Sequence, residues 1–133
     1  MFYVTGLPRS STAWWANLLT VHNHYCYHEP SLDFDGFERD IYIKRRLYEG
    51  VGISDSALCT YYKDIVRSGE PMLIIIREPS EVRDSLNRLF DFDCTDAVER
   101  MVEMVQSIDH DNIRLYKYEN LSDLNKIQEA CEF

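Results

Sequence analysis

The chain has 133 residues, of which 45% are apolar, and a formal net charge of −9. This composition predicts one folded domain over residues 1–133, and the charge argues against a general nucleic-acid binder, which needs a basic surface to displace counterions. The longest apolar run, Met72–Ile76, has the length of a strand rather than of a membrane span. Without a basic and then apolar leader at the N-terminus, the cytoplasm is the expected compartment, and no membrane partner is expected.

The first part of the chain predicts a strand, a helix and a second strand. The strands are expected at residues 2–5 and 24–28, and the helix at residues 14–21. The helix carries an apolar stripe that includes both tryptophans. We expect Trp14 and Trp15 to pack in the core rather than to stack on a nucleobase.

The middle of the chain alternates in the same way. A charged and aromatic segment at about residues 34–48 predicts a helix, residues 50–54 a strand, and residues 57–66 a further helical segment. The clearest strand covers residues 72–76. Its unbroken apolar run is expected where both faces of a sheet are covered.

The last part predicts three helices and one strand. Pro79 suits the first turn of a helix. Its core stripe is expected to consist of Val82, Leu86, Leu89 and Phe90. Asp96 with Glu99 predicts a capping pair for the next helix, and residues 113–118 predict the last strand. A terminal helix is expected to contain Leu121, Leu124 and Ile127.

Strands that alternate with helices predict an α/β fold. We expect a three-layer sandwich around a central parallel sheet of about five strands, like that of P-loop nucleoside triphosphate hydrolases. In such sheets the ligand crevice lies at the carboxyl ends of the strands. The loops after Thr5 and after Ile76 both follow strands, so they should face one ligand if their strands are neighbours.

The loop after the first strand has the composition of an anion site. A loop that enters a helix offers free backbone N–H groups and the positive end of a helix dipole. Arg9 adds a charge, and three consecutive hydroxyl residues follow it. We therefore expect a phosphate or sulfate to bind residues of this loop, which are Gly6, Leu7, Pro8, Arg9, Ser10, Ser11, Thr12 and Ala13.

This loop departs from the Walker pattern of nucleoside triphosphatases. When GxxxxGK[ST] is aligned on Gly6, Ser11 replaces the second glycine, Thr12 the lysine, and Ala13 the Mg²⁺-binding hydroxyl. Chemistry that depends on a divalent metal is therefore disfavoured, and an anion site without a metal is expected.

Two separate motifs carry a family resemblance. "TGLPRSSTAWWANLL" resembles the 5′-phosphosulfate loop of P-loop sulfotransferases, with Ser11 and Ala13 in place of the usual glycine and threonine. "IIIREPSEVRDSLNR" resembles the 3′-phosphate segment of that family, in which an arginine ends a strand and a serine follows eight residues later. Here these residues are Arg77 and Ser85. "GVGISDSAL" and "LYKYENLS" resemble segments of the same family less closely.

The resemblance implies a sulfotransferase that uses 3′-phosphoadenylyl sulfate as its donor, without a metal. The donor would bind residues 6–13, Arg77 and Ser85, and the sulfuryl group would pass to a hydroxyl or amine of a small-molecule or glycan acceptor. Arg9 would stabilise the developing charge. Family members are commonly about twice as long as this chain, so a homo-oligomer could be needed to complete the pocket.

The catalytic base has three candidates. Glu29 and His28 stand at the end of the second strand, at the edge where the loops are expected, and Glu29 is slightly preferred. Asp55 follows the third strand, where an N-cap is its expected role. The acceptor contacts would come from residues 31–48. Aromatic residues there, which core packing would also explain, are Phe34, Phe37 and Tyr42.

Two alternatives to the sulfotransferase stay open. One is a non-catalytic module of the same fold that binds a nucleotide or phosphate, and the other is a P-loop nucleotide kinase. The cysteines are scattered, with no CxxC and no suitably spaced histidine, so they predict reduced, mostly buried thiols rather than a zinc site. They are Cys26, Cys59, Cys94 and Cys131.

Overall fold

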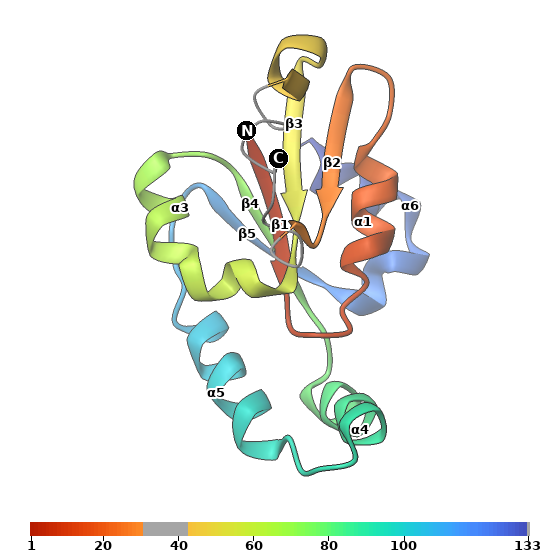
Figure 1. The fold of residues 1–133 in the computed structure, drawn as a ribbon, viewed down its shortest axis with the longest axis vertical. Coiled ribbons are helices and arrows are strands. Elements are labelled where there is room, and N and C mark those ends of the chain that lie inside the picture. The colour runs from red at the N-terminus through yellow and green to blue at the C-terminus, as the bar shows by residue number, and fades with distance from the viewer. Residues whose placement is uncertain (31–42, 133) are drawn as a thin grey trace.

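The computed structural model describes residues 1–30 and 43–132. Parallel strands alternate with helical segments throughout this part of the chain (Figure 1). The strands are β1 (Phe2–Gly6), β2 (His24–His28), β3 (Gly50–Ser54), β4 (Met72–Ile76) and β5 (Ile113–Lys117). The helices are α1 (Thr12–Leu19), α3 (Tyr62–Ser68), α4 (Pro79–Phe90), α5 (Thr95–Gln106) and α6 (Leu124–Cys131), with 3-10 turns η2 (Ser56–Tyr61) and η3 (Tyr118–Ser122).

The five strands form one parallel sheet in the order β2-β3-β1-β4-β5. The predicted α/β class, strand positions and strand number are therefore confirmed. β1 lies at the centre, paired with β3 on one side and β4 on the other. This order makes the loops after β1 and β4 neighbours.

Helices cover both faces of the sheet, as a three-layer arrangement requires. Side chains of β4 alternate between the faces: Leu73 and Ile75 pack with residues of α1 and α6, whereas Met72 and Ile74 pack with residues of α3 and α5. Figure 1 shows α1 and α6 on one side of the strands and α3 on the other. All four side chains are buried, which explains the unbroken apolar run.

A third cluster joins the loop after β1 to the helices that follow β4. Leu7 is buried against Val82 and Leu86 of α4 and against Val98 of α5. Leu7, the first residue after β1 and one of the predicted anion-site residues, thus has its side chain in the core and anchors the loop directly before Pro8 and Arg9. This anchoring restrains the backbone where the ligand is expected.

Gly6 is required by the sheet. A Cβ at this position would lie 2.5 Å from the carbonyl oxygen of Ile75, its partner in β4. Gly6 therefore allows the backbones of β1 and β4 to lie close together.

Several predicted details are wrong. Leu89 and Phe90 are 60% and 54% exposed, because α4 projects beyond the strands and only its first turns reach the core (Figure 1). Trp15 is fully buried, but Trp14 is 40% exposed because α1 turns only one face to the sheet. Leu121 lies in η3 rather than in the terminal helix, whereas Leu124 and Ile127 lie in α6 as predicted.

The predicted capping pair of Asp96 and Glu99 is also wrong. α5 begins at Thr95, which places Asp96 inside the first turn rather than before it. The carboxylate that receives a hydrogen bond here is that of Asp93, 2.9 Å from the backbone nitrogen of Thr95. The hydrogen bonds from Thr95 lower the pKa of Asp93.

Candidate anion-binding site

The loops after β1 and β4 diverge at a topological switch point. From β1 the chain runs through α1 to β2, whereas from the adjacent β4 it runs through α4 and α5 to β5, on the opposite side of the sheet. Such a divergence opens a crevice outside the carboxyl ends of two neighbouring strands, which is where open α/β sheets bind ligands. The two motifs of the sequence therefore meet at this point.

The backbone of the first loop alternates between left-handed and ordinary conformations. Arg9 and Ser11 both have positive φ values, 67° and 64°, with Ser10 between them in the ordinary range. An alternation of this kind turns successive N–H groups toward one side. The N–H group of Ser10 donates to the carbonyl of Leu7 at 3.2 Å, which closes the turn.

The N-terminus of α1 has no side-chain cap. Ser11 occupies the N-cap position, but its side chain makes no capping hydrogen bond. Among the described residues, the backbone N–H groups of Ser11, Thr12 and Ala13 also have no acceptor. The start of α1 therefore keeps the unpaired donors that an anion could accept from.

Arg9, Arg77 and Ser85 lie together. Arg9 Nε donates to Ser85 Oγ at 3.2 Å, and Arg77 Nη1 donates to the carbonyl oxygen of Arg9 at 2.8 Å. These contacts join positions 68 and 76 residues apart in the sequence. Both arginines thus belong to the same edge of the sheet.

Arg77 is also held by two residues outside the sequence motif. Its Nε donates to Glu81 Oε2 at 3.0 Å, and its guanidinium carbon lies 4.6 Å from the centre of the Tyr118 ring. Glu81 lies four residues after Arg77, a spacing at which an arginine and a glutamate can pair. The geometry contains this ion pair together with the contacts to the first loop.

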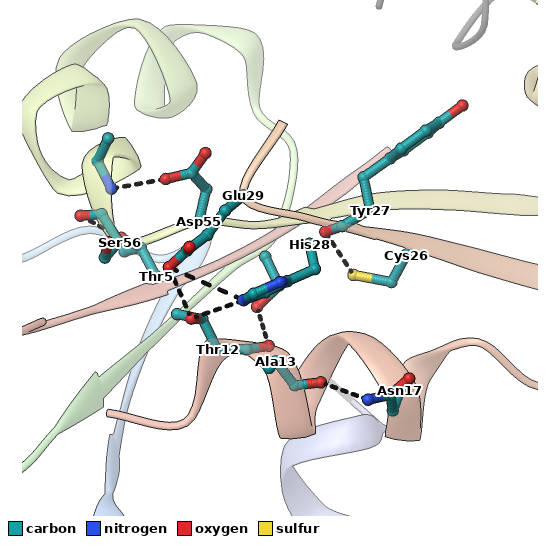
Figure 2. A network of polar contacts seen from close by, with 12 residues as sticks. Thr5, Thr12, Ala13, Asn17, Cys26, Tyr27, His28, Glu29, Asp55 and Ser56 are labelled. Carbon is teal, nitrogen blue, oxygen red and sulfur yellow. Dashed lines mark hydrogen bonds and ion pairs between the residues drawn. The ribbon is translucent and has the colours of Figure 1, made fainter. Parts of the chain in front are cut away.

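The catalytic candidates gather on the other side of the first loop. The hydroxyl of Thr12 lies 3.3 Å from Glu29 Oε1, to which it donates, and 3.4 Å from His28 Nε2 (Figure 2). Because Thr12 has one hydroxyl proton, both contacts form together when His28 Nε2 carries a proton and donates it to Thr12. His28 Nε2 and Glu29 Oε1 are 3.8 Å apart.

Backbone contacts fix this group of residues. Ser54 Oγ donates to the carbonyl oxygen of Thr12 at 2.8 Å, which ties the first turn of α1 to β3. Glu29 has a positive φ of 44°, and its N–H donates to the carbonyl of Ser54. The strained conformation turns the chain at the end of β2 so that the Glu29 carboxylate reaches Thr12.

Two of the predicted hydroxyl donors of the loop do not face outward. Ser10 is 1% exposed, and its Oγ has no hydrogen-bond partner among the described residues. Thr12 is 8% exposed, and its hydroxyl is engaged with Glu29. The turn therefore directs both side chains inward, away from the exposed surface of the loop.

Asp55 is the N-cap of η2. Its side chain accepts from the N–H of Ala57 at 2.8 Å, and the residue is 2% exposed. Its own N–H donates to the carbonyl of Val4, so it also fixes β1 to the start of η2. The N-cap interpretation from the sequence is confirmed.

Sequence reasoning missed Tyr118 and Ser54 as parts of the site. Each ends or directly follows a strand, and in a parallel sheet all such positions share one edge. The strand order was the missing information, because it decides which strand ends are neighbours. The predicted acceptor residues Phe34, Phe37 and Tyr42 lie outside the described residues.

A separate cavity of about 540 Å³ lies at the opposite edge of the sheet. It is lined mainly by apolar side chains from the starts of the strands and from α1 and α6, among them Phe2, Leu18, Leu73 and Ala130. Its lining includes Trp15, Leu18 and Leu19 from the helical part of the first motif, but none of residues 6–13, Arg77 or Ser85. Its lining suits packing rather than an anion.

Within the described ranges, no three His, Cys, Asp or Glu side chains gather as metal ligands would. Cys26 and Cys94 are buried free thiols, and burial raises the pKa of Cys26 to about 12. Cys131 is free and exposed, so two of the three described cysteines are buried. The side chain of Cys59 is outside the described part. No helix in that part has the length and apolar character to cross a membrane.

In sequence comparisons, no protein-family model matches the chain, and no curated protein matches it.

Proposed function

We propose that this chain is a P-loop sulfotransferase that takes a sulfuryl group from 3′-phosphoadenylyl sulfate. The observation that carries the proposal is the meeting of Arg9, Arg77 and Ser85 at the switch point of the sheet. The family resemblance implies that these three residues share one nucleotide site, and their contacts with one another are consistent with that implication.

In this proposal, residues that follow β1 bind one end of the nucleotide, and residues that follow β4 bind the other end. The free N–H groups at the start of α1, with Arg9, suit the 5′-phosphosulfate. Arg77 and Ser85 suit the 3′-phosphate, since a guanidinium can bind two phosphate oxygens at once. Because these groups supply the positive charge locally, the site remains compatible with a net charge of −9.

Glu29 and His28 are proposed to handle the acceptor's proton. In the transfer, the donor supplies the sulfuryl group to an acceptor hydroxyl or amine whose proton must be removed. Glu29 is the preferred base and His28 the alternative, and both contact Thr12 at the end of the loop away from Arg77. The acceptor would therefore approach from the side of β2.

Calorimetric titration with 3′,5′-adenosine bisphosphate, the desulfated product, tests the nucleotide site. The wild type should bind, and Arg77→Ala should weaken binding roughly 10- to 100-fold, the cost of losing charge-assisted hydrogen bonds. Arg67→Ala is a matched control, because Arg67 pairs with Asp64 on α3 and is exposed. Absence of heat at millimolar nucleotide, or equal binding by Arg77→Ala, would contradict the proposal.

A non-catalytic nucleotide-binding module is the second candidate. The engagement of Glu29 and His28 with Thr12 favours it, because neither group stands free for an acceptor. A radiolabelled donor offered with pooled hydroxyl and amine acceptors separates the two functions. Labelled product supports the transferase, whereas bisphosphate binding without product supports the module.

A further inference from the structure

The guanidinium of Arg77 is held from three directions. It donates to the carbonyl of Arg9 and to the carboxylate of Glu81, and one face lies against the ring of Tyr118. The two hydrogen bonds use two of the N–H groups of the guanidinium, and the aromatic contact uses none. Tyr118 therefore restrains Arg77 without competing with a ligand for its donors.

The contact follows from the register of the sheet. Ile76 of β4 pairs with Lys117 of β5, and Arg77 and Tyr118 are the residues directly after them. Tyr118 is itself partly buried against the core cluster that contains Trp15 and Tyr116. The ring is thus anchored on the protein core, whereas the Glu81 side chain is 56% exposed.

We propose that Tyr118 is a positioning residue of the 3′-phosphate subsite, which sets the plane of the Arg77 guanidinium. This inference rests on the proposed function, because it assigns the 3′-phosphate to Arg77. A free arginine side chain loses rotamer entropy when it is fixed. The ion pair with the exposed Glu81 offsets little of that cost, because solvent-exposed ion pairs contribute little to stability. The ring fixes the arginine before the ligand arrives.

The test compares two nucleotides that differ by one phosphate. Calorimetry gives the dissociation constants of 3′,5′-adenosine bisphosphate and of adenosine 5′-monophosphate, and their ratio isolates the 3′-phosphate. Tyr118→Leu should weaken bisphosphate binding roughly three- to tenfold, from the usual strength of a cation–π contact, and leave monophosphate binding unchanged. Tyr118→Phe keeps the ring and should bind both nucleotides like the wild type.

A double-mutant cycle shows whether Tyr118 acts through Arg77. In an Arg77→Ala background, Tyr118→Leu should no longer alter the nucleotide ratio. Thermal melting of each variant confirms that the comparison is made on folded protein. An equal loss of both nucleotides in Tyr118→Leu, or an unchanged effect in the Arg77→Ala background, would overturn the inference and leave the proposed function standing. Failure of the wild type to bind the bisphosphate would overturn both.

Discussion

The carboxyl and amino edges of the sheet differ in the kinds of residues that they bury. The buried polar residues of the described chain lie at the carboxyl edge or in the loop and helix start that follow it: Thr5, Ser10, Thr12, Ser54 and Asp55. Three of the five described non-glycine residues with positive φ also lie there, namely Arg9, Ser11 and Glu29. The amino edge instead holds an apolar cavity between α1 and α6. The buried polar residues and most of the left-handed residues therefore lie at the carboxyl edge, and the apolar cavity lies at the amino edge.

This difference suggests a division between function and stability. Buried polar groups and left-handed residues lower the stability of the folded state. Packing elsewhere in the fold has to offset that cost. Here the compensation comes from the two apolar layers, in which Trp15 joins α1 to the sheet and to α6. Substitutions at the two edges should therefore have different consequences.

Trp15→Ala should have the largest effect on stability. Trp15 is fully buried and packs edge-on against Tyr116, with the two ring centres 5.2 Å apart. Its removal leaves a large void and should lower the free energy of unfolding by about 3 to 5 kcal/mol. Trp14→Ala is the matched control on the next residue of the helix. Because Trp14 is 40% exposed, it should lose much less. Urea unfolding of both variants measures the difference, and equal losses would contradict the packing of α1 described above.

Glu29→Gln should have a large effect on transfer and almost none on folding. As a general base, Glu29 should contribute at least about 100-fold to the rate of sulfuryl transfer, and glutamine cannot take the proton. The amide oxygen can still accept from Thr12, so stability should change by less than about 0.5 kcal/mol.

The control for Glu29→Gln is Glu49→Gln at the amino edge. Glu49 directly precedes β3 and is exposed, so this variant should transfer and fold like the wild type. The measurement is donor turnover beside thermal melting. Unchanged turnover in Glu29→Gln would remove Glu29 as the base and leave His28 as the remaining candidate.

Most of the fold was readable from the sequence because the strands and helices are strongly patterned. Met72–Ile76 is apolar at every position. This pattern predicts a parallel sheet with both faces covered, and the structure has one. The sequence pattern does not show how far a helix extends beyond the core. Leu89 and Phe90 continue the apolar stripe of α4, yet no described element covers them, and periodicity alone does not reveal this.

The site was readable in part for a similar reason. Arg9, Arg77 and Ser85 belong to motifs with fixed spacing, whereas Tyr118 belongs to the site only through strand order and register. The inward direction of the Ser10 side chain depends on the two left-handed residues that flank it. Such backbone conformations are unusual for serine and arginine, so the composition of the loop did not predict them.

Ser11→Gly should have the smallest of these effects, and it has the opposite sign. Ser11 has φ 64° and ψ 38°, a left-handed conformation that costs a residue with a Cβ about 1 to 2 kcal/mol. Glycine adopts it freely but gains entropy in the unfolded chain, so the net stabilisation should be about 1 kcal/mol. Ser11→Ala keeps the Cβ and removes the hydroxyl, and it should give no such gain. Thermal melting should therefore rank Ser11→Gly above the wild type and Ser11→Ala. A loss of stability in Ser11→Gly would mean that the loop is not strained, and that the contrast between the edges rests on polar burial alone.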